Sequence, residues 1–294
     1  MKSAFCRCHP AVNLIFFGGV IVFAMLLNHP LFLGISMLSS LAYAVKLKGK
    51  PMLKTFFLFL FPLLIGVTLI NALTAHYGVT KLCTLWDGNS LTLESIVYGA
   101  VTGALVVITI TWFMCWNEVV TEDKFMHLFG KRMPHLALLV LMVLRFVPLY
   151  INQLKEVMDA RKNAGLESEG KFAKIKNACH AVSGVVTWAL EHSIETADSM
   201  KSRGYGLKGR TSYSRFTLSP ADITMVAAMI ILITVIAAGK IFGSINASYN
   251  PVIRLSGATP LLIFTAAFYA FYCFLPIFFD IEEEIRWNRL YAKT

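Results

Sequence analysis

Charged residues are scarce in this sequence, and acidic residues are the scarcer kind. Asp, Glu, Lys and Arg together make up 15% of the 294 residues, with 17 acids against 27 bases. Because a soluble globular domain carries about 25% charged residues, this composition argues against a soluble enzyme or binding domain. Hydrophobic residues make up 56% of the chain instead, so we expect an integral membrane protein.

The sequence also lacks the motifs that mark catalytic and metal centres. It contains neither His-Glu-x-x-His nor a nucleophile elbow, and no acidic cluster falls within an apolar run. The six cysteines have no framework spacing, and Cys6, Cys8 and His9 lack the partner cluster that would complete a zinc site. We therefore expect no catalytic residues, no cofactor and no bound metal.

One glycine-rich stretch, residues 204–211, has the glycine spacing of a phosphate-binding loop. Arg210 stands where such a loop needs Lys, and no strand signal precedes the stretch. A phosphate-binding loop follows a strand and opens a helix, whereas this stretch follows a helical pattern. We therefore do not expect it to bind a nucleotide.

Long apolar runs predict the membrane spans. A helix needs about 20 mostly apolar residues to cross the hydrocarbon core of a bilayer. Four runs meet this length, and two shorter runs flank Asn28-His29-Pro30, where the proline predicts a tight turn between two helices. The six predicted spans are residues 11–27, 31–47, 54–75, 95–116, 221–241 and 260–279.

The region between the fourth and fifth spans differs from the rest of the chain. Its one apolar run, residues 136–150, is short and contains Arg145 and Pro148. A charge deep in lipid costs at least ~2.5 kcal/mol, so we expect this run to lie at the membrane surface or re-enter it. The predicted parts are residues 1–116 with four spans, 117–220 as a cytoplasmic region, and 221–294 with two spans and a tail.

Basic residues predict the orientation of these spans. All but Lys81, Lys240 and Arg254 of the 27 Lys and Arg residues fall on one side of the six-span arrangement. The positive-inside rule makes that side cytoplasmic, so both termini are expected in the cytoplasm. This distribution also accounts for the formal charge of +10 without a nucleic-acid partner.

Two long helices are expected in the cytoplasmic region. Nothing breaks a helix between residues 150 and 164, where Gly165 can end it, and a second pattern runs over residues 172–203 before Gly204. Small side chains in the second half of its stripe favour a close helix crossing, although an ordinary amphipathic stripe fits the spacing equally well. That stripe is Phe172, Ile175, Cys179, Val182, Val186, Ala189, Ser193, Ala197 and Met200.

Two stretches at the ends of these helices carry a family resemblance. "LRFVPLYINQLKEVMDARKNAG" (residues 144–165) and "WALEHSIETADSMKSRGYG" (residues 188–206) resemble the transmembrane T component of energy-coupling factor (ECF) transporters. The resemblance implies two coupling helices, each ending in an Ala-x-x-x-Arg-Gly motif that docks in a groove of one of two ATPase subunits. There Arg would pair with an acid, while Ala and Gly would let the backbone approach closely.

The second motif fits this pattern at its charged end. Arg203 and Gly204 match the Arg-Gly pair, Met200 lies within the motif, and Ser199 or Ala197 stands nearest the small position. The resemblance therefore implies that Arg203 makes the charged contact with an ATPase subunit.

The first motif departs from the pattern. Ala160 and Gly165 match it, but Ala164 stands where the family has Arg. Arg161 lies three residues earlier on roughly the same helix face and could supply the charge from one turn back. This departure puts the first docking contact in doubt and leaves the family resemblance intact.

The resemblance implies a non-catalytic transport subunit in the cell membrane of a prokaryote. Its expected partners are two ATP-binding-cassette ATPases, a substrate-binding S component and the lipid bilayer. The family takes up vitamins and transition-metal ions, and the sequence does not distinguish a shared module from one dedicated to cobalt or nickel. A membrane-embedded lipid-modifying enzyme is the alternative from another class, but it would need acids or His facing a cytoplasmic cleft.

Overall fold

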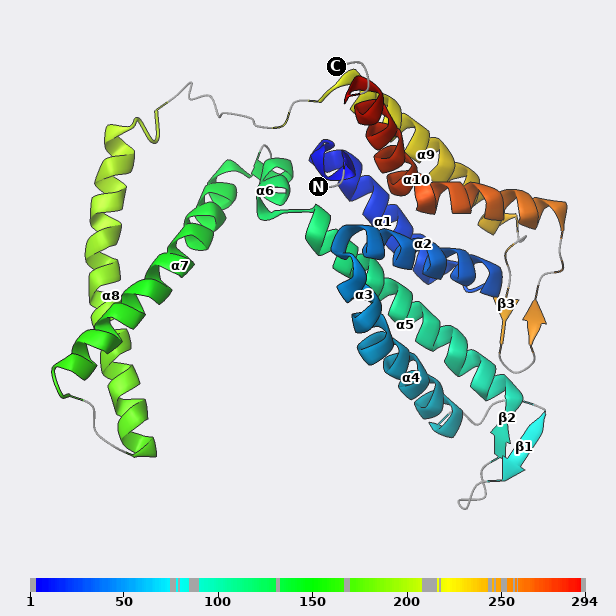
Figure 1. Cartoon of the computed structure of the whole chain (residues 1–294), viewed down its shortest axis with the longest axis horizontal. Coiled ribbons are helices and arrows are strands. Elements are labelled where there is room, and N and C mark those ends of the chain that lie inside the picture. The colour runs from blue at the N-terminus through cyan, green and yellow to red at the C-terminus, as the bar shows by residue number, and fades with distance from the viewer. Residues whose placement is uncertain are drawn as a thin grey trace. The chain divides into compact units, whose positions relative to one another are not determined.

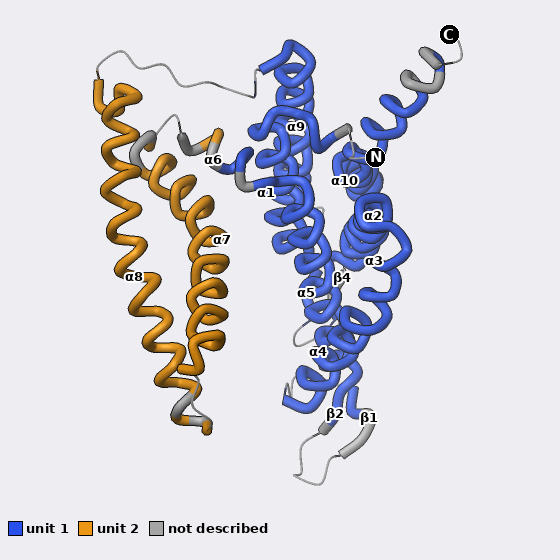
Figure 2. The backbone as a smooth tube through the Cα atoms, turned by 60° about the vertical axis from the view of Figure 1, so that its left-hand side comes forward, with its two compact units in different colours: residues 1–125, 216–294 blue, residues 126–215 orange. Residues whose placement is uncertain are grey.

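A computed structural model provides the structure of the chain. It describes residues 4–74, 78, 80–84, 90–130, 133–166, 170–207, 216, 218–242, 245, 247–249, 253–255, 257 and 259–291. The chain forms two compact units, one of Met1–Phe125 with Phe216–Thr294 and one of Met126–Arg215 (Figure 2). The second unit is thus an insertion in the sequence of the first.

Helices make up almost all of the described structure (Figure 1). The first unit holds η1 (Ala4–Arg7), α1 (Pro10–Leu26), α2 (Pro30–Lys48), α3 (Lys50–Thr55), the π-helical turn η2 (Phe56–Leu60), α4 (Phe61–Thr74), α5 (Leu93–Val119), α9 (Pro220–Ile241) and α10 (Pro260–Tyr291). Helix α6 (Glu122–Gly130) leads into the second unit, which holds α7 (Pro134–Asn163) and α8 (Lys171–Ser202). The expected all-α fold class is confirmed.

Two short antiparallel ribbons accompany the helices of the first unit. One pairs β1 (Lys81–Thr84) with β2 (Ser90–Thr92), and the other pairs β3 (Ala247–Ser248) with β4 (Arg254–Leu255). They lie in the two longer loops of that unit and do not form a layer of the fold.

Proline and a capping side chain start several of the helices. Helices α1 and α2 each begin with proline, and the Nδ1 atoms of His9 and His29 accept a hydrogen bond from the second helical N–H at 3.2 and 3.3 Å. A proline at this position sacrifices no helical hydrogen bond. Helix α9 has Ser219 as its N-cap, which forms a complete capping box with Asp222.

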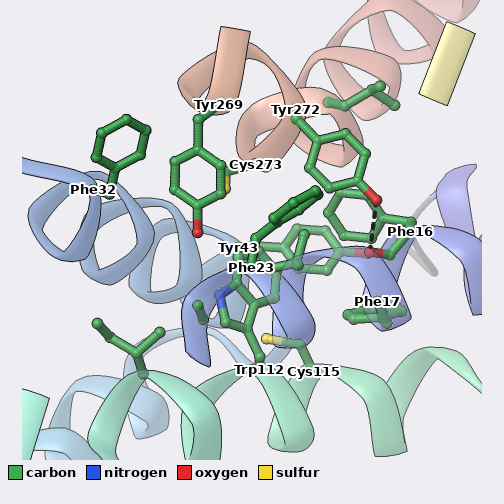
Figure 3. Close-up of a cluster of buried hydrophobic side chains, with 14 of the residues drawn as sticks. Phe16, Phe17, Phe23, Phe32, Tyr43, Trp112, Cys115, Tyr269, Tyr272 and Cys273 are labelled. Atoms are coloured by element: carbon green, nitrogen blue, oxygen red, sulfur yellow. Dashed lines mark hydrogen bonds between the residues drawn. The ribbon is translucent and has the colours of Figure 1, made fainter. Parts of the chain in front are cut away.

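An aromatic cluster forms the core of the first unit (Figure 3). Phe16 and Phe17 come from α1, Tyr43 from α2, Trp112 from α5 and Tyr272 from α10, and all five are fully buried. Two of their polar groups bond inside the bundle: the Tyr272 hydroxyl donates to the Phe16 carbonyl at 3.1 Å, and the Trp112 indole N–H donates to Ser36 Oγ at 3.2 Å. The cluster joins the consecutive helices α1 and α2 to α5 and α10, which are distant from them in sequence.

Helices α4 and α5 approach each other closely at two glycines. A Cβ atom placed on Gly99 would lie 2.8 Å from the carbonyl oxygen of Thr68, and one on Gly103 would lie 3.0 Å from that of Leu64. The Gly99–Gly103 spacing is the small-xxx-small pattern that lets membrane helices pack backbone to backbone. These glycines therefore set the distance between α4 and α5.

Six described helical stretches are long and apolar enough to cross a membrane. They are Pro30–Lys48, Lys50–Thr74, Leu93–Val119, Leu136–Asn163, Pro220–Ile241 and Pro260–Ile285. This set differs from the predicted spans, because α1 is a shorter apolar helix and α7 meets the criterion instead. The multi-pass character of the chain is confirmed, while the position of each helix in a bilayer stays a prediction.

Helix α7 includes the apolar run of the middle region. It continues without a break from Pro134 to Asn163 and has Pro148 inside it. A proline removes one helical hydrogen bond and can kink a helix without ending it. Whether residues 136–150 lie at the membrane surface remains a prediction.

We predict that Gly99→Ala destabilises the first unit by about 1–3 kcal/mol, because the added methyl group would overpack the α4–α5 contact. Thermal unfolding of the purified protein in detergent would show this as a lower midpoint. Gly34→Ala in α2 is the matched control, since a Cβ atom there meets nothing within 4 Å. Equal midpoints for the two variants would contradict the close approach.

Candidate functional site

Helices α7 and α8 form an antiparallel pair in the second unit (Figure 2). The two helices are in contact at Gly184 of α8, where an added Cβ atom would lie 3.8 Å from Cγ1 of Val157 in α7. Ala181 and Val185, on the same face of α8, are buried. The predicted stripe on α8 faces elsewhere: its members Phe172, Val182 and Val186 are 90%, 49% and 52% exposed.

A ring of four aromatic side chains joins the two helices. Phe146 and Tyr150 of α7 stack at a centroid distance of 5.8 Å, and Trp188 and His192 of α8 stack at 5.0 Å with an interplanar angle of 6°. Edge contacts of 5.9 and 6.1 Å join Tyr150 to Trp188 and Phe146 to His192. Such pairs each contribute about 0.5–1.5 kcal/mol beyond the area they bury, so the ring fixes the crossing.

Both helices end in the same Schellman motif. At the end of α7, Gly165 N–H donates to the Lys162 carbonyl at 3.0 Å, and Leu166 N–H donates to the Arg161 carbonyl at 3.1 Å. Gly165 has φ +69°, a left-handed conformation that glycine adopts without a steric penalty. The helix therefore ends at the residue where the sequence placed its end.

The end of α8 repeats this geometry. Gly204 N–H donates to the Lys201 carbonyl at 2.9 Å, and Tyr205 N–H donates to the Met200 carbonyl at 3.0 Å. Gly204 has φ +80°. The two helix ends can therefore be matched position by position.

This match relates the residues of the two expected motifs. Arg203, the C-cap of α8, corresponds to Ala164, the C-cap of α7, and Met200 corresponds to Arg161. Four residues before each C-cap stand Ser199 and Ala160, whose carbonyls accept the C-cap N–H. Ser199, and not Ala197, is therefore the counterpart of Ala160.

The two arginines lie in different surroundings. Arg203 is exposed at the tip of α8, whereas Arg161 is half-buried one turn beyond Val157, on the α7 face that packs towards α8. Within the part of the chain that the structure describes, no carboxylate lies at ion-pair distance from either guanidinium. Arg203 thus presents an unpaired charge beside a left-handed glycine.

The two Schellman motifs lie at opposite ends of the antiparallel pair. Helix α8 has 32 residues and is therefore ~48 Å long at 1.5 Å per residue. Because α8 begins close in sequence to the end of α7, this length approximates the separation of the two motifs.

The other motifs of the sequence do not form a site in the described residues. No three His, Cys, Asp or Glu side chains there are grouped to hold a metal. Burial raises the pKa of the Cys8 thiol to about 12, which disfavours the thiolate that a metal would need. In the glycine-rich stretch, Gly204 ends a helix, and residues 208–211 lie outside the described residues.

Sequence reasoning missed the aromatic ring and the role of Lys124. The ring members stand four residues apart on each helix, a spacing that signals aromatic pairs on one face. Lys124 is 4% exposed and bonds to residues more than 100 positions away, which no local pattern indicates.

Comparisons with known proteins match most of the chain. The sequence model of a cobalt transport protein family, CbiQ, matches residues 1–213. The energy-coupling factor transporter transmembrane protein EcfT of Lactobacillus helveticus is 25% identical over 190 residues, which cover 58% of this chain and 67% of that protein. The protein of the same name from Leuconostoc gelidum is 28% identical over 104 residues, which cover 34% of this chain and 39% of that protein.

We predict that Gly165→Ala loosens the end of α7, because alanine in the left-handed conformation costs roughly 1–2 kcal/mol. Nothing lies within 4 Å of the added atom, so the effect is conformational and not steric. Faster amide hydrogen exchange at residues 165 and 166 would report it. Gly184→Ala inside α8 is the control, and unchanged exchange in both variants would contradict the need for glycine.

Proposed function

The chain belongs to the CbiQ family of cobalt transport proteins and is the T component of an ECF transporter, and we propose that it couples ATP hydrolysis by two partner ATPases to substrate uptake. A separate S component would bind the substrate and reorient in the membrane. The chain itself would act as a non-catalytic scaffold between them.

The matched helix ends are the observation that carries this proposal. Each of α7 and α8 ends in a left-handed glycine that leaves the backbone accessible, and the two ends lie ~48 Å apart. Two separate protein subunits can occupy sites at that distance. We assign one ATPase to each end.

Arg203 supplies the charged contact at the end of α8. Its guanidinium is exposed and has no acid partner in the described chain, so a carboxylate in an ATPase groove can pair with it bidentately. Ser199, Met200 and Gly204 would line the contact, with Ala197 further from the tip.

The end of α7 would dock with less charge. Ala160, Ala164 and Gly165 present a small, exposed surface, while Arg161 is half-buried towards α8. Arg161 can replace the arginine missing at Ala164 only if its side chain turns outward. The proposal therefore assigns the stronger charged contact to the α8 end.

The substrate class follows from the S component that this chain serves. The description of the family names cobalt, which favours a T component dedicated to cobalt or nickel. The two EcfT relatives carry no substrate in their names, and a shared module for several vitamins fits them as well. The membrane scaffold is the same in both cases.

The ends of the first unit support one orientation. Phe5 N–H donates to Asp280 of α10 at 3.0 Å, and Lys46 at the end of α2 lies 3.7 Å from the same carboxylate. The N-terminal turn and the ends of α2 and α10 therefore share one side. We propose that this side, which is rich in basic residues, faces the cytoplasm.

We predict that the chain purified alone neither binds nor hydrolyses ATP. It should co-purify with two ATPase subunits when all are expressed together. Equilibrium binding of a fluorescent ATP analogue measures the first point. Saturable binding that is lost in Lys208→Ala or Arg210→Ala would overturn the non-catalytic assignment.

We predict that Arg203→Glu abolishes uptake and weakens assembly with the ATPases. Losing one partner of a desolvated charge pair costs about 2–5 kcal/mol, which is at least ~30-fold in affinity. Lys201→Glu, two residues earlier and exposed, is the matched control and should change affinity by less than ~1 kcal/mol. Wild-type uptake and co-purification in Arg203→Glu would remove the coupling role.

The α7 end gives a separate prediction. If Arg161 replaces the missing arginine, Arg161→Glu should reduce uptake and the added Ala164→Arg should restore it. If Arg161 only packs against α8, Arg161→Glu should lower the thermal midpoint of the chain, and Ala164→Arg should restore nothing. Uptake and unfolding measured on the same variants separate the two roles.

A further inference from the structure

Two chain segments connect the first unit to the inserted second unit, and both bond to the same short element. One connection leaves α5 through Lys124, and the other enters α9 at Ser219 and Asp222. The shared element is residues 4–9, which we call the N-terminal turn. All the contacts described below lie within the first unit.

Lys124 holds the first connection to the N-terminal turn. Its ammonium group donates to the carbonyl of Val119 at 2.9 Å, in the last residue of α5, and to the carbonyl of Cys6 at 2.5 Å. The side-chain amide of Asn13, oriented to satisfy both neighbours, accepts from the same group at 2.8 Å and donates to the Phe5 carbonyl at 3.1 Å. Lys124 therefore bonds to Cys6 in the N-terminal turn and to Asn13 in α1, and Asn13 itself bonds to Phe5 in the turn.

The buried charge of Lys124 suits helix ends. The last carbonyls of a helix carry partial negative charge, and an ammonium group placed there satisfies them. Burial lowers the pKa of Lys124, because the surroundings disfavour its charged form. An apolar residue would avoid this cost but would leave the carbonyls of Val119 and Cys6 without this donor.

Asp222 holds the second connection to the same turn. Its carboxylate accepts a hydrogen bond from the His9 backbone N–H at 3.4 Å and completes the capping box with Ser219. Asp222 therefore serves both as the cap of α9 and as a contact to the turn. Lys124 and Asp222 therefore contact the N-terminal turn at two places, Cys6 and His9.

The N-terminal turn is itself fastened to the helices of the first unit. Its Phe5 N–H bonds to Asp280 of α10, which also pairs with Lys46 of α2, and Arg7 pairs with Glu283 at 3.3 Å. A displacement of either connection therefore acts on α2 and α10 as well as on the other connection.

We propose that the N-terminal turn is a crossbar between the two connections, and that Lys124 and Asp222 are positioning residues that transmit movement of α7 and α8 to the helices of the first unit. The inference rests on the coupling function proposed above. It adds the place in the chain at which the movement passes from one unit to the other.

The test uses the complete transporter, with both ATPases and the S component, reconstituted in liposomes. The measured quantity is the amount of substrate taken up per ATP hydrolysed. We expect Lys124→Met and Asp222→Ala each to lower this ratio about tenfold, with assembly kept and ATP hydrolysis within twofold of wild type. Lys124→Arg, which keeps the charge, should retain most of the ratio.

Two control variants separate transmission from folding. Lys54→Met removes an exposed lysine of α3 and should leave the ratio unchanged. Ser219→Ala weakens the α9 cap but keeps the contact between Asp222 and His9, so its ratio should stay near wild type. If Asp222→Ala and Ser219→Ala lower the uptake per ATP equally, Asp222 acts only as a helix cap and the crossbar is refuted.

The double variant gives a readout that independent structural damage would not produce. Because both residues act on one element, Lys124→Met with Asp222→Ala should lower the ratio little further than either change alone. Multiplicative losses, or an unchanged ratio in an assembled complex, would overturn the crossbar. If the Lys124→Met protein does not accumulate, the uptake per ATP of Asp222→Ala is compared with that of Ser219→Ala. A lower ratio in Asp222→Ala alone supports the crossbar, and equal ratios refute it. Failure of the wild-type chain to assemble with ATPases would instead refute the proposed function.

Discussion

The last carbonyl groups of a helix have no partner within that helix, and this structure meets the requirement in two ways. Helices α7 and α8 fold the following glycine back over their ends, so the carbonyls bond to the chain itself. Helix α5 ends instead on the ammonium group of Lys124, which lies in the interior. The first solution leaves an end open to another protein, whereas the second ties the end to the rest of the unit.

The two units differ in the same way: the first packs mainly against itself, whereas the second exposes much of its surface. The first unit surrounds an aromatic core drawn from four helices and closes one of its ends with the hydrogen bonds and ion pairs of the N-terminal turn. The second unit holds one helix pair, joined by four aromatic rings and with most of its apolar side chains exposed. The coupling function proposed above would require both properties.

Local signals in the sequence were sufficient for the helix ends and insufficient for packing. The helix ends at Gly165 and Gly204 were predicted because each depends only on neighbouring residues. The continuation of α7 through Pro148 was not predicted, since charge and proline are weak evidence for a break. The sequence did not indicate which side of α8 faces α7, because that side is marked by the aromatic ring and not by the aliphatic stripe. Lys124 was missed because its partners are distant in sequence.

The aromatic ring lies near the middle of both helices, so each helix extends on both sides of the point where the rings join them. Measured from the centre of the ring at 1.5 Å per residue, α7 extends ~21 Å to its start and ~23 Å to its end, and α8 extends ~28 Å to its start and ~18 Å to its end. With the rings as a pivot, the two arms on one side are therefore ~18–21 Å long and the two on the other side ~23–28 Å. A rotation that brings two helix ends together by a few ångströms would then move the other two by a similar distance, with little gain in either force or travel.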